Sequence, residues 1–176
     1  QLCWERPNDC AVVHLTLIPY LSAAGELKTK PTQHSVKSLQ ESGVFPDVLV
    51  CRTEYELTEG IRRKLALFCN VQTDSVIQSI DAATIYDVPK LMKEEQLDKV
   101  VLKKLSLNHS GEADITNWEE FVYHLNNPKH TIDIALVGKY VELKDSYKSI
   151  SESFIHASSF TRCKVNLHWI CSEKLD

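Results

Sequence analysis

The sequence predicts an α/β protein that is built on parallel β-sheets. Short apolar segments rich in β-branched residues alternate with longer segments in which apolar residues recur every three or four positions. The first apolar segment is nearly continuous, which is typical of a strand covered on both faces of a parallel sheet. The chain of 176 residues is 43% hydrophobic and 25% charged, so it has the length and the composition to bury a core.

The first half of the chain contains three predicted strands. Residues 12–18 form the first strand, and residues 32–42 form a helix that Gly43 ends. Residues 48–51 form the second strand, which is short and apolar. Residues 75–80 form the third strand. Strands that alternate with helices in this way favour a parallel sheet with helices on its faces.

A second helix is predicted between the second and third strands. Thr58 is a suitable N-cap residue, and the helix should run from there to Cys69. Ile61, Leu65 and Phe68 are spaced three or four residues apart, so we expect them to share the buried face.

The segment from residue 87 to residue 125 is predicted to be helical. Asp87 should cap a turn that contains a proline, and residues 97–105 carry a second apolar stripe. Thr116 and Glu119 have the spacing of a capping box. Residues 126–128, with the sequence Asn-Asn-Pro, interrupt the pattern, and we expect a domain boundary there.

Beyond this break the strand–helix alternation begins again. Residues 131–137 and 163–170 are predicted strands, and residues 146–160 form the helix between them. One βαβ unit cannot bury both faces of its own sheet, so we expect the start of a second α/β domain. The predicted division is residues 1–127 and residues 128–176.

Composition excludes several classes of protein. The net charge of −4 gives no indication of nucleic-acid binding, and no apolar run approaches the roughly 20 residues that span a bilayer. There is no C-x-x-C pair among the six cysteines, and Cys51 and Cys69 lie in apolar surroundings typical of small core residues. We therefore expect a cytoplasmic protein in a reducing compartment, without a membrane partner.

One segment has the residues expected of an anion-binding site. Its sequence is Lys28-Thr29-Lys30-Pro31-Thr32-Gln33. It lies between the first strand and the start of a helix, and ligands of open α/β sheets bind outside the carboxyl ends of the strands. Two lysines beside a helix N-terminus suit a phosphate group, although a solvated basic loop would also explain a plain Lys-x-Lys pattern.

Two further basic positions follow the second strand. Arg52 comes directly after it and should lie at the same edge of the sheet. Lys64 belongs to a run of three basic residues, 62–64, on the next helix. Such a run is most often a solvated surface, but a long lysine near the carboxyl edge of the sheet could also reach a phosphate.

Other familiar catalytic motifs are missing from the sequence. Gly138-Lys139-Tyr140 lacks the earlier glycine and the following Ser or Thr of a phosphate loop. There is no dinucleotide-binding fingerprint and no nucleophile elbow, so no cysteine is a credible nucleophile. No catalytic residue and no metal ligand is therefore predicted on this chain.

The basic segment and its surroundings closely resemble the CTP synthase family. The resemblance rests on residues 14–20, 26–37, 46–52, 64–70, 85–89 and 137–143, together with Asp145, Tyr147, Lys148 and Ser149, and so covers nearly the whole chain. It implies the C-terminal part of a Rossmann-like, P-loop amidoligase type of parallel-sheet domain, followed by the start of a class I glutaminase α/β domain.

Enzymes of this family make CTP from UTP, ATP and glutamine. The resemblance implies that ATP phosphorylates O4 of the uracil and that ammonia from glutamine displaces the phosphate. It also implies GTP as an allosteric activator, CTP as a feedback inhibitor and a homotetramer, and it leaves open whether filaments form. The family's phosphate loop and Mg²⁺ ligands are expected upstream of Gln1, and the glutaminase Cys, His and Glu downstream of Asp176. The fragment by itself is therefore expected to be inactive.

The resemblance also implies roles for individual residues. The UTP- or CTP-binding residues would be Lys28, Thr29, Lys30, Pro31, Thr32, Gln33 and Lys64. The ATP-binding residues would be Arg52, Ile80, Asp81 and Ala82. Two alternatives remain open: a non-catalytic nucleotide-binding module, and another ATP-dependent amidoligase, against which the basic hexamer argues.

Overall fold

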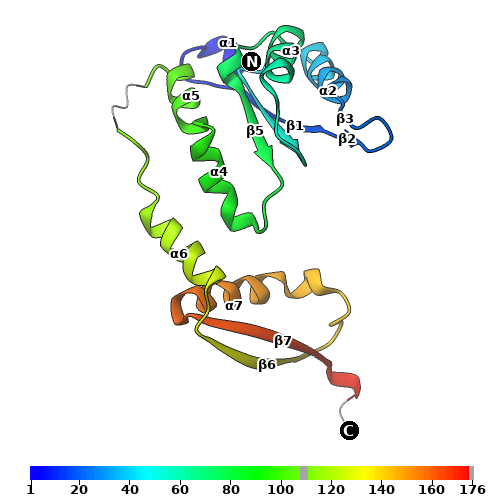
Figure 1. Cartoon of the computed structure of the whole chain (residues 1–176), viewed down its shortest axis with the longest axis vertical. Coiled ribbons are helices and arrows are strands. Elements are labelled where there is room, and N and C mark those ends of the chain that lie inside the picture. The colour runs from blue at the N-terminus through cyan, green and yellow to red at the C-terminus, as the bar shows by residue number, and fades with distance from the viewer. Residues whose placement is uncertain (108–110, 175–176) are drawn as a thin grey trace. The chain divides into compact units, whose positions relative to one another are not determined.

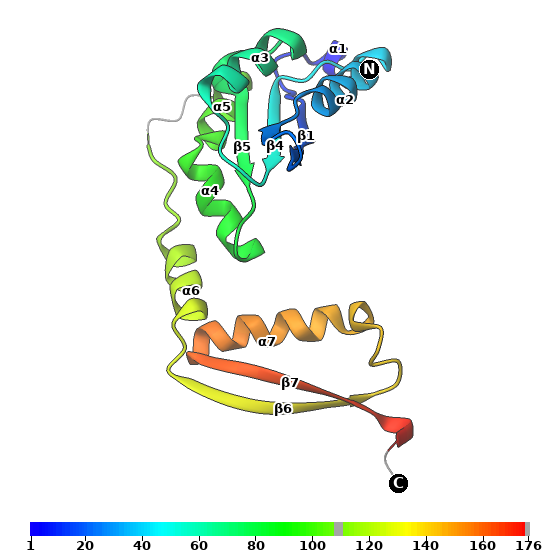
Figure 2. The ribbon, with the colours of Figure 1, turned by 45° about the vertical axis from the view of Figure 1, so that its right-hand side comes forward.

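The structure, a computed structural model, describes residues 1–107 and 111–174. They form two compact units, Gln1–Ala113 and Asp114–Asp176, which we describe separately. In the first unit, strands β1 (Val13–Ile18), β4 (Val48–Thr53) and β5 (Val76–Ile80) form a parallel sheet with β4 in the middle (Figure 2). The predicted parallel α/β sheet is therefore confirmed for this unit.

Helices cover both faces of the sheet. On one face, α2 (Lys30–Glu41) and α3 (Glu59–Cys69) pack over a core that includes Ile18, Val36, Leu49, Cys51 and Leu65. On the other face, α4 (Val88–Glu94) and α5 (Leu97–Lys104) pack over Val48, Val50 and Ile77. Successive residues of a strand point to opposite faces, which explains why neighbours in β4 belong to different cores.

The expectation that the first strand is covered on both faces is wrong for this chain. Thr16 and Ile18 of β1 are buried towards α2, but Val13, Leu15 and Leu17 are 45%, 69% and 56% exposed. The core formed by α4 and α5 draws its strand residues from β4 and β5, so it leaves the second face of β1 open.

Helix α3 begins and ends as predicted, but its buried face differs. The Thr58 side chain accepts a hydrogen bond from the Ile61 N–H, which confirms the N-cap. Leu65 and Cys69 are fully buried, whereas Phe68 is 60% exposed. The expectation that Phe68 shares the buried face is therefore wrong, because the helix is rotated towards Ala66 and Cys69.

The turn at Asp87 also differs from the expectation. Its carboxylate does not cap α4. Instead, the carboxylate Oδ2 accepts a hydrogen bond from the Thr84 N–H at 3.1 Å, while the Thr84 hydroxyl caps the short 3-10 helix Ile85–Asp87. The two residues thus form a capping box at the start of this 3-10 helix, where the sequence predicts only a cap by Asp87 on the turn that follows.

The remaining elements of the first unit are short. They are α1 (Leu2–Glu5), the antiparallel pair β2 (Tyr20–Leu21) and β3 (Glu26–Leu27), and a 3-10 turn at Thr73–Ser75. Within the described part of the chain, no helix has both the length and the apolar character needed to cross a bilayer.

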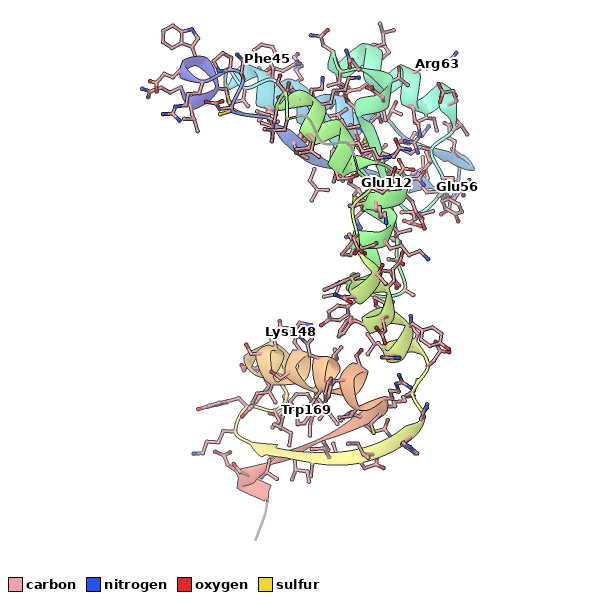
Figure 3. The ribbon with its side chains drawn as sticks, turned by 90° about the vertical axis from the view of Figure 1, so that its left-hand side faces the viewer. Phe45, Glu56, Arg63, Glu112, Lys148 and Trp169 are labelled. Carbon is pink, nitrogen blue, oxygen red and sulfur yellow. The ribbon has the colours of Figure 1, made fainter. Side chains whose placement is uncertain are left out.

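The second unit is a βαβ unit with one additional helix. Strands β6 (His130–Gly138) and β7 (Cys163–Cys171) are parallel, as predicted, and α7 (Lys148–Thr161) lies along them (Figure 1). Figure 3 shows Trp169 between α7 and the strands. Short 3-10 turns lie at Lys144–Tyr147 and Ser172–Lys174.

Helix α6 (Thr116–Asn126) belongs to this second unit. The Ser159 hydroxyl of α7 donates a hydrogen bond to the Phe121 carbonyl of α6 at 2.7 Å, so the chain divides after Ala113 and not at residues 126–128. The predicted capping box is also wrong. The N-cap position is Ile115, and the Asp114 carboxylate accepts the hydrogen bond from the Thr116 N–H.

Two cysteines are core residues, as predicted. Cys51 and Cys69 are both fully buried, and burial raises the pKa of Cys51 to about 12 and that of Cys69 to about 11. At pH 8 about one thiol in a thousand or fewer would be in the reactive thiolate form at these positions.

We therefore expect iodoacetamide at pH 8 to modify the exposed Cys3 readily and to leave Cys51 and Cys69 unmodified until the protein unfolds. Mass spectrometry of the alkylated, digested protein measures this, with a sample alkylated in urea as the control. Alkylation of Cys51 as fast as Cys3 in the folded protein would contradict the core assignment.

Candidate functional site

The predicted basic segment lies directly after the carboxyl end of β1. The hairpin of β2 and β3 leads the chain back, and the Lys28 N–H donates a hydrogen bond to the Pro19 carbonyl at 2.9 Å. Helix α2 begins at Lys30 with Pro31 in its first turn, where a missing N–H costs nothing. The first N–H groups of a helix have no intrahelical partner, so this helix start suits an anion.

The polar residues of the segment divide into buried and accessible ones. Thr32 is fully buried, and its hydroxyl donates to the Leu17 carbonyl at 3.0 Å and accepts from the Thr16 hydroxyl. Its hydroxyl therefore fastens α2 to β1. Thr29 is also buried, and its hydroxyl accepts a hydrogen bond from the Gln33 amide. These two buried threonines therefore stabilise the start of α2 through hydrogen bonds within the protein.

The lysines lie on the accessible side of the same helix start. Lys28 forms an ion pair with Glu26, and Lys30 is exposed. The hydrogen bond from Lys28 lowers the pKa of Glu26, and the positive charges of Lys28 and Lys64 lower it further. Lys64 of α3 is thus close enough to act on the carboxylate that Lys28 contacts. The structure therefore brings together lysines that are 36 positions apart in the sequence.

A second group of predicted residues lines a cavity of about 390 Å³ at the ends of β4 and β5. Its lining consists of Leu15, Arg52, Ser79, Ile80, Asp81, Ala82, Thr84, Ile85 and Val88. The four predicted ATP-binding residues, Arg52, Ile80, Asp81 and Ala82, are therefore all part of one cavity. Its walls combine aliphatic side chains with a few polar groups, as is common in sites for small ligands.

Arg52 and Asp81, which both line this cavity, form an ion pair. The Arg52 Nε lies 3.0 Å from the Asp81 Oδ1, and both side chains are largely exposed. A ligand with negative charge could compete for the guanidinium, because an exposed ion pair contributes little to stability.

The two groups lie at the same edge of one sheet. In the parallel register, Leu17 of β1 is level with Arg52 of β4, which is level with Ser79 of β5. Arg52 is itself one of these positions, and Lys28 and Asp81 lie in the segments that follow Leu17 and Ser79. The carboxyl edge of an open parallel sheet is where ligands of such folds bind.

Sequence reasoning missed several residues of the site. Glu26, which pairs with Lys28, was not predicted as part of it. Thr84, Ile85 and Val88 belong to the segment after β5 and line the cavity. The family resemblance includes residues 85–89, and this was a usable signal for two of them. Nothing in the sequence indicated Leu15, which lines the cavity because the second face of β1 is open.

No metal-binding site is found among the residues that the structure describes. No group of three or more His, Cys, Asp or Glu side chains in residues 1–107 and 111–174 is arranged to hold a metal ion.

Comparison with known proteins supports a common origin over the whole chain. Residues 1–107 match the family model described as CTP synthase N-terminus. The chain is 64% identical to a CTP synthase of Flavobacterium psychrophilum and 61% identical to one of Cytophaga hutchinsonii, over 100% and 99% of its own length. A CTP synthase of Porphyromonas gingivalis is 52% identical over 99% of the chain.

The chain spans about a third of the length of these relatives, 33%, 33% and 32% respectively. The family model covers more than half of the chain. The matched residues include Lys28, Lys30 and Lys64, which we call the lysine cluster, and the cavity beside Arg52. The chain therefore belongs to the CTP synthase family.

Proposed function

We propose that the protein containing this chain converts UTP to CTP, with ATP and with ammonia released from glutamine. A carbonyl oxygen is a poor leaving group, so ATP first transfers a phosphoryl group to O4 of the uracil. Ammonia then attacks C4 and displaces the phosphate. The products are CTP, ADP and inorganic phosphate, and hydrolysis of glutamine, which supplies the ammonia, leaves glutamate. The family membership of the chain supports this proposal.

The lysine cluster is the single observation that carries the proposal to this chain. Lys28 and Lys64 act on one carboxylate, and Lys30 begins the adjoining helix. A nucleoside triphosphate carries several negative charges, which ammonium groups and helix N–H groups can offset. We assign the triphosphate of UTP, or of competing CTP, to the helix start at residues 28–33 together with Lys64.

We assign ATP to the cavity beside Arg52. Its aliphatic walls suit the face of an adenine ring, and the guanidinium of Arg52 can hydrogen-bond an anionic oxygen once it leaves Asp81. The chain's own residues would thus bind and orient two nucleotides at one sheet edge. We assign the residues that activate the ATP to other parts of the protein. We also assign the ligands of the accompanying Mg²⁺ to those parts.

The second unit is proposed to begin the glutaminase domain. It is a parallel βαβ unit, the expected start of such an α/β domain. GTP as activator, CTP as feedback inhibitor and a homotetramer are part of the same proposal, and they follow from the family alone.

The proposal is tested by measuring CTP formation. The intact protein, supplied with UTP, ATP, Mg²⁺ and glutamine, should produce CTP, detected by chromatography. The 176-residue chain alone should produce none, because it contains no phosphate-loop sequence. No CTP from the intact protein would contradict the function, and turnover by the chain alone would contradict the assignment of ATP activation to other parts.

A further inference from the structure

Strand β5 lies at one end of the sheet order β1-β4-β5, so one side of its backbone has no neighbouring strand in the described residues. An open edge of this kind exposes N–H and C=O groups that can pair with another chain. In β5 the outward groups include the Val76 carbonyl and the Gln78 N–H, which are not the groups that face β4.

Two charged side chains bind these outward groups. The Arg62 Nη1 of α3 donates a hydrogen bond to the Val76 carbonyl at 2.7 Å. The Glu95 Oε2, just after α4, accepts a hydrogen bond from the Gln78 N–H at 2.9 Å. In a parallel sheet, a residue of the next strand would make the same two bonds, donating to the first carbonyl and accepting from the N–H two residues later.

The same two side chains also bind each other. The guanidinium donates from Nη1 to Glu95 Oε2 at 2.8 Å and from Nη2 to Oε1 at 2.9 Å. This is the bidentate geometry in which an arginine–carboxylate pair is strongest. Their side chains are only 20% and 22% exposed, so the pair is much more sheltered than the pair of Arg52 and Asp81, in which the side chains are 66% and 47% exposed.

The edge residues Val76 and Ile77 also line a surface groove. The groove has a volume of about 540 Å³, and Arg62, Asp74, Glu94, Glu95, Lys99 and Lys103 are among its lining residues. Charged side chains of both signs beside an edge strand discourage pairing with another chain. The pair formed by Arg62 and Glu95 occupies the hydrogen-bonding positions themselves.

We propose that Arg62 and Glu95 together act as a side-chain substitute for a missing strand, closing the free edge of β5 against pairing with a further β-strand. The pair has the donor and the acceptor in the order that the edge requires. The role of the pair therefore depends on which side chain donates and which accepts a hydrogen bond, as well as on their charges. An ordinary ion pair between two helices depends on the charges alone.

Amide hydrogen exchange at Gln78 in the intact protein tests the first part of this proposal. In Glu95→Ala, the Gln78 N–H loses a charged acceptor, and its exchange should become about tenfold to a hundredfold faster. Glu95→Gln keeps an acceptor oxygen and should retain most of the protection. Glu94→Ala, which alters a neighbouring exposed residue, is the matched control and should leave Gln78 unchanged.

A charge exchange separates edge closure from simple ion pairing. The double variant Arg62→Glu with Glu95→Arg keeps two opposite charges but places a carboxylate against the Val76 carbonyl and a guanidinium against the Gln78 N–H. We expect it to exchange at Gln78 as fast as Glu95→Ala. We also expect both variants to associate at high concentration in light scattering, with an increase in intermolecular β-structure measured by infrared spectroscopy.

The results have distinct meanings. Full protection of Gln78 in Glu95→Ala, or recovery of protection in the double variant, would overturn the proposal. Faster exchange without any association would overturn its second part, closure against other strands. Circular dichroism and Cys51 alkylation on each variant identify global unfolding. If Glu95→Ala unfolds, Glu95→Gln, which removes the charge and keeps an acceptor oxygen, is compared with the wild-type protein instead.

Discussion

Replacing Lys64 by alanine in the intact protein should weaken the binding of both UTP and CTP by about tenfold to a hundredfold, because each nucleotide loses one charge-assisted contact to its triphosphate. Lys30→Ala should have an effect in the same range. The two lysines are exposed on their helices, so neither replacement removes packing. Isothermal titration calorimetry with each nucleotide measures the effect directly.

Matched controls lie on the same helices. Arg63 is adjacent to Lys64 on α3, where Figure 3 shows it on the outer surface, and it pairs with Glu59. Lys37 is two turns after Lys30 on α2 and is also exposed. Arg63→Ala and Lys37→Ala should change nucleotide affinity by less than about threefold. If Lys64→Ala bound both nucleotides as tightly as Arg63→Ala, the assignment of the triphosphate to this cluster would be wrong.

The lysine cluster also shows how much of a binding site can be predicted from the sequence. The position of the basic segment, after a strand and at a helix start, could be predicted because both elements have strong local patterns. The convergence of Lys28 and Lys64 on Glu26 could not, because it depends on how α2 and α3 pack side by side. The sequence also does not distinguish the inward Thr32 from the outward Lys30; the hydrogen bond to Leu17 makes that distinction.

The fold could be predicted to a similar extent. Strand positions and the parallel arrangement followed from β-branched runs separated by helices. The open second face of β1 did not follow, because its nearly continuous apolar run predicts two covered faces, whereas the described helices cover only one of them. Helix α6 was assigned to the wrong unit for a related reason: the Asn-Asn-Pro break is a real chain feature, but the contact with α7 determines the unit.

Helix α3 provides the largest expected effect on stability. Leu65 is fully buried among residues of β1, α2 and β4, so Leu65→Ala should remove its transfer free energy and leave a cavity. We expect the free energy of unfolding to fall by about 2–5 kcal/mol. Leu67, two residues later and 79% exposed, offers the same chemical change without burial, and Leu67→Ala should cost about 0.5 kcal/mol or less.

Urea unfolding followed by circular dichroism measures both variants. The comparison also tests the helix rotation that the sequence did not predict, because Phe68→Ala should resemble Leu67→Ala if Phe68 is outside the core. A loss of several kcal/mol for Phe68→Ala would show instead that Phe68 shares the buried face with Leu65, as the sequence periodicity predicts. Because Lys64 precedes Leu65 on the same helix, this rotation also determines whether that lysine can reach the carboxylate beside the basic segment.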